Sequence, residues 1–368
     1  MTCFISPLKC EGCSHVSCSR RAGANWITDT VPRTGVDVTY EDFTQFKARD
    51  SVFFDRMQNF RGCARSFHAD AGWTTEMLTD VSAPVWGKCA AVSETVSGTL
   101  RALVVNNWLT GSLLAPASTN PPVALQTLGS TGAWTVESFP ATCKRNGRDE
   151  GFGGAMCGVY AERCSTALLD RSNGETMVIY ETFDCGLVVG RRRGAEPWTF
   201  RETPASNSLR TLVQSNDVAP SADFAAVESG GTVFVMWRTA EGDLLLGKVD
   251  DASGEVASVK TLVERDFHDG SMVADARGIH VAVTHVDDRS LEVIDLDSAG
   301  NEVARQTIVG ERAYMPAIAS DGAGGLAIAF NDPGPRPLPK DFNWPLRVAL
   351  RSPAGDWTVE LVDTFVIK

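Results

Sequence analysis

The apolar residues of this chain fall into short segments that end at glycine, proline or small polar residues. Many segments alternate apolar and polar positions, which is typical of half-buried β-strands, and others are continuous apolar runs such as Thr232–Trp237. No stretch shows the sustained 3.6-residue apolar period of an amphipathic helix. The pattern therefore predicts an all-β protein with little helix.

One strand pattern recurs along the chain and defines a repeat. Tryptophan followed by threonine opens four segments, and weaker copies lack one or both residues. The seven segments begin at Trp26, Trp73, Trp134, Trp198, Val256, Val303 and Trp357. Glycine-containing hairpin turns precede several of them, at Ser253–Gly254, Ala299–Gly300 and Ala354–Gly355.

Three further strands precede this segment in each repeat of the second half of the chain. The predicted second strands are 232–237, 278–284 and 325–330, and the predicted third strands are 244–249, 291–296 and 346–350. Four short strands in a repeat of roughly 50–60 residues indicate a β-propeller blade. We predict a single β-propeller of six or seven four-stranded blades over residues 32–368.

The place of residues 1–31 in this ring depends on how the chain closes. If the tail at 364–368 supplies the inner strand of a blade whose outer strands come from residues 1–31, the ring has seven blades. If residues 1–31 form a disulfide-tied cap, the ring has six. The sequence favours seven.

The predicted first strands, together with the turn Ala319–Gly325, resemble the β-propeller superfamily that includes bacterial sialidase-like and lectin-like repeat proteins. The resemblance covers most of the chain and implies the fold. The Asp-box of that group is not met, because Ser320, Asp321 and Gly322 have the wrong internal spacing. The resemblance therefore implies no catalytic residue.

The cysteines point to an oxidising compartment. The even number of 10 and the lack of a second Cys-x-x-Cys pair favour disulfides over structural zinc. All lie in the first 185 of the 368 residues, at Cys3, Cys10, Cys13, Cys18, Cys63, Cys89, Cys143, Cys157, Cys164 and Cys185. We expect a disulfide-stapled N-terminal half in an extracellular or periplasmic protein of a bacterial surface, although no export signal and no transmembrane segment are visible.

The net charge of −12 argues against a nucleic-acid or anionic-membrane partner. Candidate ligand contacts lie where loops enter the inner strands, because ligands usually bind at that mouth of a propeller. Segments 264–269 and 310–314 align, so Arg265 and Arg312 should take equivalent rim positions. Guanidinium groups match carboxylates and aromatic rings stack on sugars. The candidates at this mouth are Arg265, His268, Asp269, Arg312, Tyr314, Asp149 and Trp86.

A second candidate surface is the proline-rich insertion from Asn331 to Pro345, which carries Phe342 and Trp344. A stiff loop presents an aromatic pair at low entropic cost, which suits binding. The same rings would equally serve to cap an exposed blade. For the mouth, the alternative is that Glu–Arg pairs tie adjacent blades together.

We therefore expect a binding module that recognises a glycan or a protein partner through one face. The alternatives are a hydrolase or lyase acting on polysaccharide at the mouth, and a scaffold of a surface assembly. No catalytic motif is recognisable, so no catalytic residue is assigned. No cofactor or metal is expected: His280 and His285 face opposite sides of a strand, and the loops at Asp250 and Asp297 lack the full ligand set of a calcium site.

Overall fold

The computed structural model describes the chain over a set of segments that together carry all of its assigned strands. These segments are residues 2–7, 14–22, 25–30, 45–48, 51–58, 60–69, 72–78, 87–95, 98–106, 123–129, 132–139, 144–145, 148–149, 166–182, 186–203, 224–239, 241–332 and 342–367. Their regular structure is all β-strand, which confirms the predicted fold class. Within these segments there is no helix long and apolar enough to span a membrane.

The described strands form seven antiparallel sheets of three or four strands and one short hairpin, and in every sheet the spatial order follows the sequence. The N-terminal sheet has three strands, β1 (Thr2–Pro7), β2 (Ser14–Ala22) and β3 (Asn25–Thr30). The next two have four strands each: β4 (Gln45–Ala48), β5 (Ser51–Gln58), β6 (Phe60–Ala69), β7 (Gly72–Met77); then β8 (Gly87–Glu94), β9 (Leu100–Asn106), β10 (Val123–Leu128), β11 (Trp134–Phe139). The hairpin is β12 (Lys144–Arg145) and β13 (Arg148–Asp149).

The chain from Thr166 onward supplies four more sheets of four strands. The first two of these sheets contain β14 (Thr166–Asp170), β15 (Glu175–Thr182), β16 (Gly186–Arg193) and β17 (Thr199–Thr203), and then β18 (Ala225–Ser229), β19 (Thr232–Arg238), β20 (Leu244–Val249) and β21 (Val256–Val263). The third contains β22 (Phe267–Asp275), β23 (Gly278–His285), β24 (Leu291–Leu296) and β25 (Glu302–Val309). The last contains β26 (Tyr314–Ser320), β27 (Leu326–Asn331), β28 (Phe342–Arg351) and β29 (Trp357–Ile367). The predicted second and third strands of these repeats match observed strands closely.

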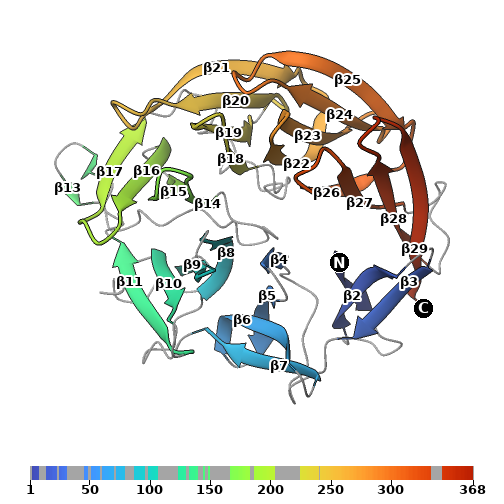
Figure 1. Cartoon of the computed structure of the whole chain (residues 1–368), viewed down its shortest axis with the longest axis horizontal. Helices are drawn as coiled ribbons and strands as arrows, with labels where there is room; N and C mark the ends of the chain where they lie inside the picture. Colours follow the sequence, from blue (N-terminus) through green and yellow to red (C-terminus); the bar gives the residue numbers. More distant parts are fainter. Residues whose placement is uncertain are drawn as a thin grey trace.

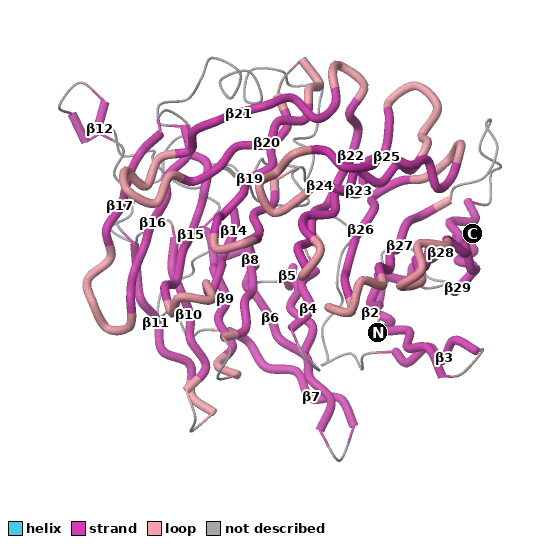
Figure 2. Tube along the Cα trace, turned by 45° about the horizontal axis from the view of Figure 1, so that its top comes forward, coloured by secondary structure: helices cyan, strands magenta, loops and turns pink. Residues whose placement is uncertain are grey.

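The sheets stand in a ring around a common centre, with the first strand of each four-stranded sheet innermost and the fourth outermost (Figure 1). Inner strands of successive sheets contact one another, from β4 and β8 through β14, β18 and β22 to β26. Strand β1 contacts both β4 and β29, so the N-terminal sheet lies between the first and last four-stranded sheets. Seen obliquely, the strands stand side by side and the connections gather at their ends (Figure 2). The architecture is that of a β-propeller.

The recurrent tryptophan-threonine segments mark the outer strands of the ring. Strands β3, β7, β11, β17, β21, β25 and β29 each begin at or next to one of the seven predicted marks. The hairpin glycines before several of them, including Gly254, Gly300 and Gly355, have φ values of 74°, 83° and 100°. Glycine adopts positive φ without steric cost, and this explains why it recurs at these turns.

The C-terminal tail differs from the prediction. Residues 364–367 continue β29 and pair with the beginning of β28, so they are not the inner strand of the N-terminal sheet. The extension gives the backbone of the tail its hydrogen-bond partners within the last sheet. Phe342 and Trp344 consequently lie in strand β28, opposite Ile367 and Phe365, and not on a rigid loop. The rest of the proline-rich insertion, 333–341, lies outside the described residues.

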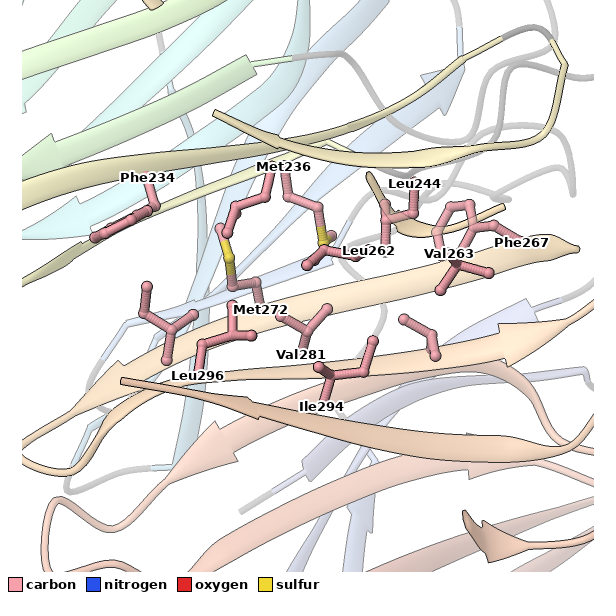
Figure 3. Close-up of a cluster of buried hydrophobic side chains, with 13 residues drawn as sticks. Phe234, Met236, Leu244, Leu262, Val263, Phe267, Met272, Val281, Ile294 and Leu296 are labelled. Atoms are coloured by element: carbon pink, nitrogen blue, oxygen red, sulfur yellow. The ribbon is translucent and has the colours of Figure 1, made fainter. Parts of the chain in front are cut away.

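The core lies between the sheets, so the second strand of a blade is buried on both faces. In β19, Val233, Val235 and Trp237 pack with the β14–β17 sheet, whereas Phe234 and Met236 pack with the β22–β25 sheet. Figure 3 shows the second group meeting side chains of the neighbouring sheet. Alternate side chains of a strand point to opposite faces, so a strand covered on both sides reads as a continuous apolar run.

One end of the ring carries buried ion pairs between adjacent sheets; we call it the ion-pair end. It contains the turns from first to second and from third to fourth strands. Arg171 after β14 has a side chain only 2% exposed, and its Nη1 lies 2.7 Å from Glu175 Oε2 and 2.8 Å from Asp251 Oδ1. Its Nε lies 3.3 Å from Glu228 Oε1. Glu228 and Asp251 belong to the next sheet, so this arginine joins two blades.

A second network joins the last two sheets at the same end. His280 has Nδ1 2.5 Å from Asp295 Oδ1 and Nε2 3.1 Å from Asp275 Oδ1. Arg351 of the next sheet places Nη1 2.7 Å from Asp295 Oδ2, and the Ser320 hydroxyl donates to Asp275. The sequence indicated an ordinary sheet histidine at position 280. In the structure its partners are Asp275, Asp295 and Arg351, which lie on three other strands.

The described part of the chain contains no free cysteine. Cys63 in β6 is 1% exposed and packs in the core with Leu78 and with Leu100, Ala102 and Val104 of the next sheet. The pairing of the cysteines stays a prediction.

Candidate functional site

At the end of the ring opposite the ion-pair end, three described connections lie next to one another. These are the loops β21–β22, β23–β24 and β25–β26, which lie where the first strands β22 and β26 begin. Backbone hydrogen bonds tie them together, because Ala313 donates to the Arg289 carbonyl at 2.7 Å and Val286 donates to the Asp266 carbonyl at 2.9 Å. The three loops therefore form one connected surface.

Left-handed backbone is concentrated at this end. Of the five non-glycine residues with positive φ in the described chain, four lie here: Arg265 (54°), Arg289 (58°), Arg312 (67°) and Met315 (50°). Each such residue costs about 1–2 kcal/mol of steric strain, which persists only where the surroundings hold it. Arg265 and Arg312 do take equivalent positions, two residues before β22 and β26 respectively. The two loops therefore share a left-handed residue at the same position before the inner strand.

Bulges in the two inner strands redirect the side chains that follow these loops. In the β22–β23 pair, Phe267 opposes His285 but Asp269 opposes Thr284, so His268 is the extra residue. The β26–β27 pair has a similar register shift after Tyr314. Phe267 is fully buried and anchors the bulge. Bulges next to functional sites commonly re-aim a side chain, and here they bring residues of β22 and β26 together.

The side chains that meet form a compact group, His268, Asp269, Arg289, Tyr314 and Met315, which we call the mouth cluster. His268 Nδ1 lies 2.5 Å from Asp269 Oδ2, and the Met315 amide donates to the same oxygen at 3.4 Å. The rings of His268 and Tyr314 meet edge to face with centroids 5.8 Å apart. The Arg289 guanidinium carbon lies 4.9 Å from the Tyr314 ring centroid, a cation–π arrangement.

Arg289 has unused hydrogen-bonding capacity. Its Nη1 atom is shielded from solvent and has no hydrogen-bond partner. A buried donor without an acceptor carries a desolvation cost that an incoming acceptor would remove. The mouth cluster thus combines a carboxylate, a guanidinium with a spare donor, and two aromatic rings.

Next to the cluster, His285 contacts two carboxylates. His285 Nδ1 lies 2.8 Å from Asp266 Oδ2, and its Nε2 lies 3.4 Å from Glu292 Oε2. The hydrogen bond with Glu292 raises the pKa of His285, burial lowers it, and Asp266 raises it again, so that the net direction is upward. Asp266 also accepts hydrogen bonds from the backbone amides of Val286 and Asp287. This pair fixes the β23–β24 loop.

The structure brings together only part of the candidate set predicted from the sequence. His268, Asp269 and Tyr314 meet in the mouth cluster. Arg265 and Arg312 flank it. The Arg312 side chain is 41% exposed, and its Nη2 lies 3.2 Å from its neighbour Glu311.

The other four candidates do not join this group in the described structure. Asp149 lies in β13, which Figure 1 places outside the ring beside β17, away from β22 and β26. Asp149 is therefore not part of the mouth cluster, contrary to the prediction, because β13 lies beside a different sheet. Trp86 lies outside the described residues. Phe342 and Trp344 have a described backbone in β28, and their side chains lie outside what is described.

Sequence reasoning missed Arg289, which completes the cluster. It lies in a short polar run, Asp287–Ser290, between two predicted strands, so its position on a loop was visible. Its approach to Tyr314 depends on the neighbouring sheet, which no local pattern reports.

The structure offers no candidate metal centre within its described segments, where no group of three or more His, Cys, Asp or Glu side chains could hold an ion. The two loops that faintly resembled calcium loops are hairpin turns. Asp250 Oδ1 accepts hydrogen bonds from the amides of Ala252 and Ser253, and Asp297 Oδ1 accepts from Ala299 and Asn301.

Comparison with solved structures finds chains of similar fold. The BP39L lectin from Burkholderia pseudomallei aligns with a TM-score of 0.59 and 15% identity over 96% of this chain and 95% of the lectin. The periplasmic gluconolactonase PpgL from Pseudomonas aeruginosa gives 0.53 and 13% over 99% and 95%. A protein from Lactobacillus plantarum gives 0.52 and 12% over 100% and 98%.

Neither the family models nor the curated proteins contain a match to this sequence. At 12–15% identity the structural likeness shows the fold alone. The chain therefore has a β-propeller fold, as the BP39L lectin and the gluconolactonase PpgL do.

Proposed function

We propose that this protein is a glycan-binding β-propeller that holds its ligand at the mouth cluster. The observation that carries the proposal is the convergence of Asp269, Arg289 and Tyr314 from two sheets onto one surface, with a guanidinium nitrogen left without a partner. The similarity of fold to the BP39L lectin supports it.

The chemistry of these groups suits a sugar. A carboxylate such as that of Asp269 accepts hydrogen bonds from sugar hydroxyls, and Arg289 donates to ring or carboxylate oxygens. Aromatic rings contact the apolar faces of sugars, and Tyr314 with His268 supplies such a surface. The left-handed loops and bulges fix these groups before the ligand arrives, which lowers the entropic cost of binding.

The proposal is tested by a glycan array probed with the native chain and with Asp269→Asn. The substitution keeps the shape of the side chain and removes its charge. We expect the native chain to bind a subset of glycans and Asp269→Asn to bind them about tenfold more weakly or worse, a change of about 1.4 kcal/mol. The matched control is Asp356→Asn, which makes the same change at an exposed turn of the ion-pair end.

Two results would overturn this proposal. One is an empty array with correctly folded protein, which would point to a protein partner or a scaffold. The other is an equal loss of binding in Asp269→Asn and Asp356→Asn, which would place the ligand elsewhere.

The second candidate function is hydrolysis at the same cluster. The 2.5 Å contact between His268 and Asp269 is an arrangement in which a carboxylate orients an imidazole for proton transfer, and the fold likeness to a gluconolactonase agrees with it. Incubation of the native chain with each bound glycan, followed by mass spectrometry, separates the two functions. A new product that disappears in His268→Gln would establish turnover, whereas glycans recovered unchanged support binding.

We also propose that the ring has seven blades, with the N-terminal sheet as the seventh. Strand β1 contacts the inner strand β4 of the first four-stranded sheet on one side and β29 of the last sheet on the other, which supports a place for the N-terminal sheet between these two sheets. Deletion of residues 1–31 should then expose the facing edges of both neighbours and lower the unfolding midpoint sharply. An unchanged midpoint would show instead that residues 1–31 are a dispensable cap.

The protein is further proposed to be exported, with its N-terminal half stapled by disulfides. The even count of 10 cysteines and the buried position of Cys63 support this. Thiol titration of denatured, unreduced protein should find few reactive cysteines. Reactivity of most of them would refute the bridges and remove the main argument for export.

A further inference from the structure

A concave site lies between the β18–β21 and β22–β25 sheets, at the ion-pair end and away from the mouth cluster. It is a cavity of about 170 Å³. One wall comes from the first of these sheets, and the other comes from the β24–β25 turn. The lining residues are Phe234, Leu246, Lys248, Ser258, Lys260, Ala299, Gly300 and Asn301.

Two ammonium groups line this cavity and no carboxylate does. The Lys248 ammonium lies 5.6 Å from the Phe234 ring centroid, and no hydrogen bond or ion pair is found for it within the described chain. Lys260 donates to the Gly300 carbonyl across the sheet boundary. In a protein with a net charge of −12, two cations face one small cavity whose lining contains no acidic residue.

The pKa of the Lys260 ammonium is lowered, mainly by burial; the carboxylates of Glu302 and Asp297 raise it, and the charge of Lys248 lowers it. The direction agrees with the geometry, because two like charges that share a poorly hydrated space disfavour each other. An anion between them would relieve that repulsion.

The backbone is distorted to form this wall. The β20–β21 pair has a bulge between Leu246 and Lys248, and Ser258 within it is the fifth non-glycine residue with positive φ, at 52°. On the opposite wall, a Cβ at Gly300 would lie 2.6 Å from Phe234 Cε1, so only glycine lets the turn pack this closely. As at the mouth, a left-handed residue and a bulge occur together, and here they adjoin a cavity.

We infer that this cavity binds the carboxylate group of a small organic acid, with the carboxylate between Lys248 and Lys260 and the apolar part of the ligand against Phe234 and Leu246. Drug-sized ligands occupy cavities of roughly 300–1,000 Å³, so the smaller volume here selects a compact ligand. The site shares no residue with the mouth cluster, so the inference is independent of the proposed glycan binding there.

The same carboxylate chemistry occurs in a free short-chain acid and in an acidic sugar. Propionate represents the first source and glucuronate the second, and glucose is the neutral counterpart of glucuronate. Calorimetric titration of the native chain with each of the three at pH 7 tests the inference. We expect binding of propionate, glucuronate or both, and none of glucose.

The variant that decides the matter is Lys248→Met, which keeps the length of the side chain and removes the charge. We expect about a tenfold or greater loss of acid binding, because one of two charge-assisted contacts is removed. Arg193→Met is the matched control: it removes one exposed positive charge on another sheet, at the end of β16. Its affinity for the acids should equal that of the native chain.

A second readout does not depend on the fold of any variant. The rate of acetylation of Lys260, followed by peptide mass spectrometry, should fall when the bound acid is added to the native chain. The inference is overturned if neither acid binds, if Lys248→Met binds as tightly as the native chain, or if the bound acid leaves the acetylation rate of Lys260 unchanged. These failures leave the mouth proposal untouched, because that one depends on the effect of Asp269→Asn.

Discussion

Both ends of the propeller carry arginines among carboxylates, but the two ends use them differently. At the ion-pair end, the Arg171 and Arg351 side chains are 2% and 9% exposed, and each bonds carboxylates that hold adjacent sheets together. At the mouth, the Arg312 side chain is 41% exposed and lies beside its sequence neighbour Glu311, and Arg289 keeps one nitrogen without a partner.

The two ends therefore differ in how exposed their arginines are and in whether these join two sheets, and an unpartnered nitrogen alone does not separate them, because Arg351 Nε also lacks a hydrogen-bond partner. An arginine whose donors already bond the next blade has little left to offer a ligand. The alternative considered from the sequence for the mouth was that Glu–Arg pairs there tie adjacent blades together. The ion pair of Arg312 stays within its own loop, whereas Arg171 at the other end does join two blades.

The largest expected effect that separates the two ends is on stability. Arg171→Met should lower the free energy of unfolding by about 3 kcal/mol, because it leaves buried carboxylates without their partner. The value is at the low end for a broken buried pair, since Arg191 still bonds Glu175 at 2.9 Å.

Urea denaturation measures this effect, and Arg312→Met at the mouth is the matched control. The control should change the free energy of unfolding by less than about 0.5 kcal/mol, as is usual for exposed ion pairs. Equal losses of unfolding free energy in Arg171→Met and Arg312→Met would contradict the proposed difference between the two ends.

The second prediction concerns pH and the His280 network. Burial lowers the pKa of His280, but the hydrogen bonds to Asp295 and Asp275 outweigh it, and the net direction is upward. The stabilisation is therefore fully present below the ordinary histidine pKa of 6.5 and is lost as pH rises through the raised value of the folded state. Thermal unfolding should show the native chain losing stability over this range.

The variant His280→Asn should lose less stability as pH rises. The decline will be reduced and not abolished, because the pKa of His285 is also raised and that residue remains. At acid pH the dependence of stability on pH is opposite. The pKa values of Asp275 and Asp295 are lowered, so the stabilisation that these carboxylates provide is lost as pH falls through the lowered values. Parallel pH profiles for the native chain and His280→Asn would exclude this role of the network.

The smallest expected effect tests the strain at the mouth. Glycine accepts the left-handed φ of 67° at position 312 without steric cost, so Arg312→Gly should be neutral or stabilising by up to about 1 kcal/mol. Arg193→Gly in strand β16 should instead destabilise by about 0.5–1 kcal/mol, because glycine loses more entropy in a strand. A comparable loss in both variants would mean that the loop stores no strain.

Much of the fold could be predicted because β-strands can be recognised from patterns of a few adjacent residues. The seven marks from Trp26 to Trp357 locate the outer strands, and the apolar run at Thr232–Trp237 corresponds to β19, which is buried on both faces. The tail was mispredicted, because Thr364–Ile367 has the same strand character whether it extends β29 or enters another sheet. Local propensity specifies that a segment is a strand, and only packing specifies its partner.

The candidate site could be predicted only in part for the same reason. His268, Asp269 and Tyr314 lie at the starts of two predicted strands, so an alignment of repeats found them. Arg289 and the partners of His280 come from other strands and from a neighbouring sheet, and no spacing in the sequence encodes those distances.

The sequence by itself determined the all-β class, the four-stranded repeat, the outer strands and the turns that require glycine, because each follows from side-chain size and polarity over a few adjacent positions. The tertiary structure alone decided which charges are satisfied. Arg171 and Arg289 are both arginines in polar turns, yet one is bonded across a sheet boundary and the other retains an unpartnered nitrogen. That outcome depends on contacts between residues far apart in the chain, where the approach of neighbouring sheets fixes the distance between donor and acceptor.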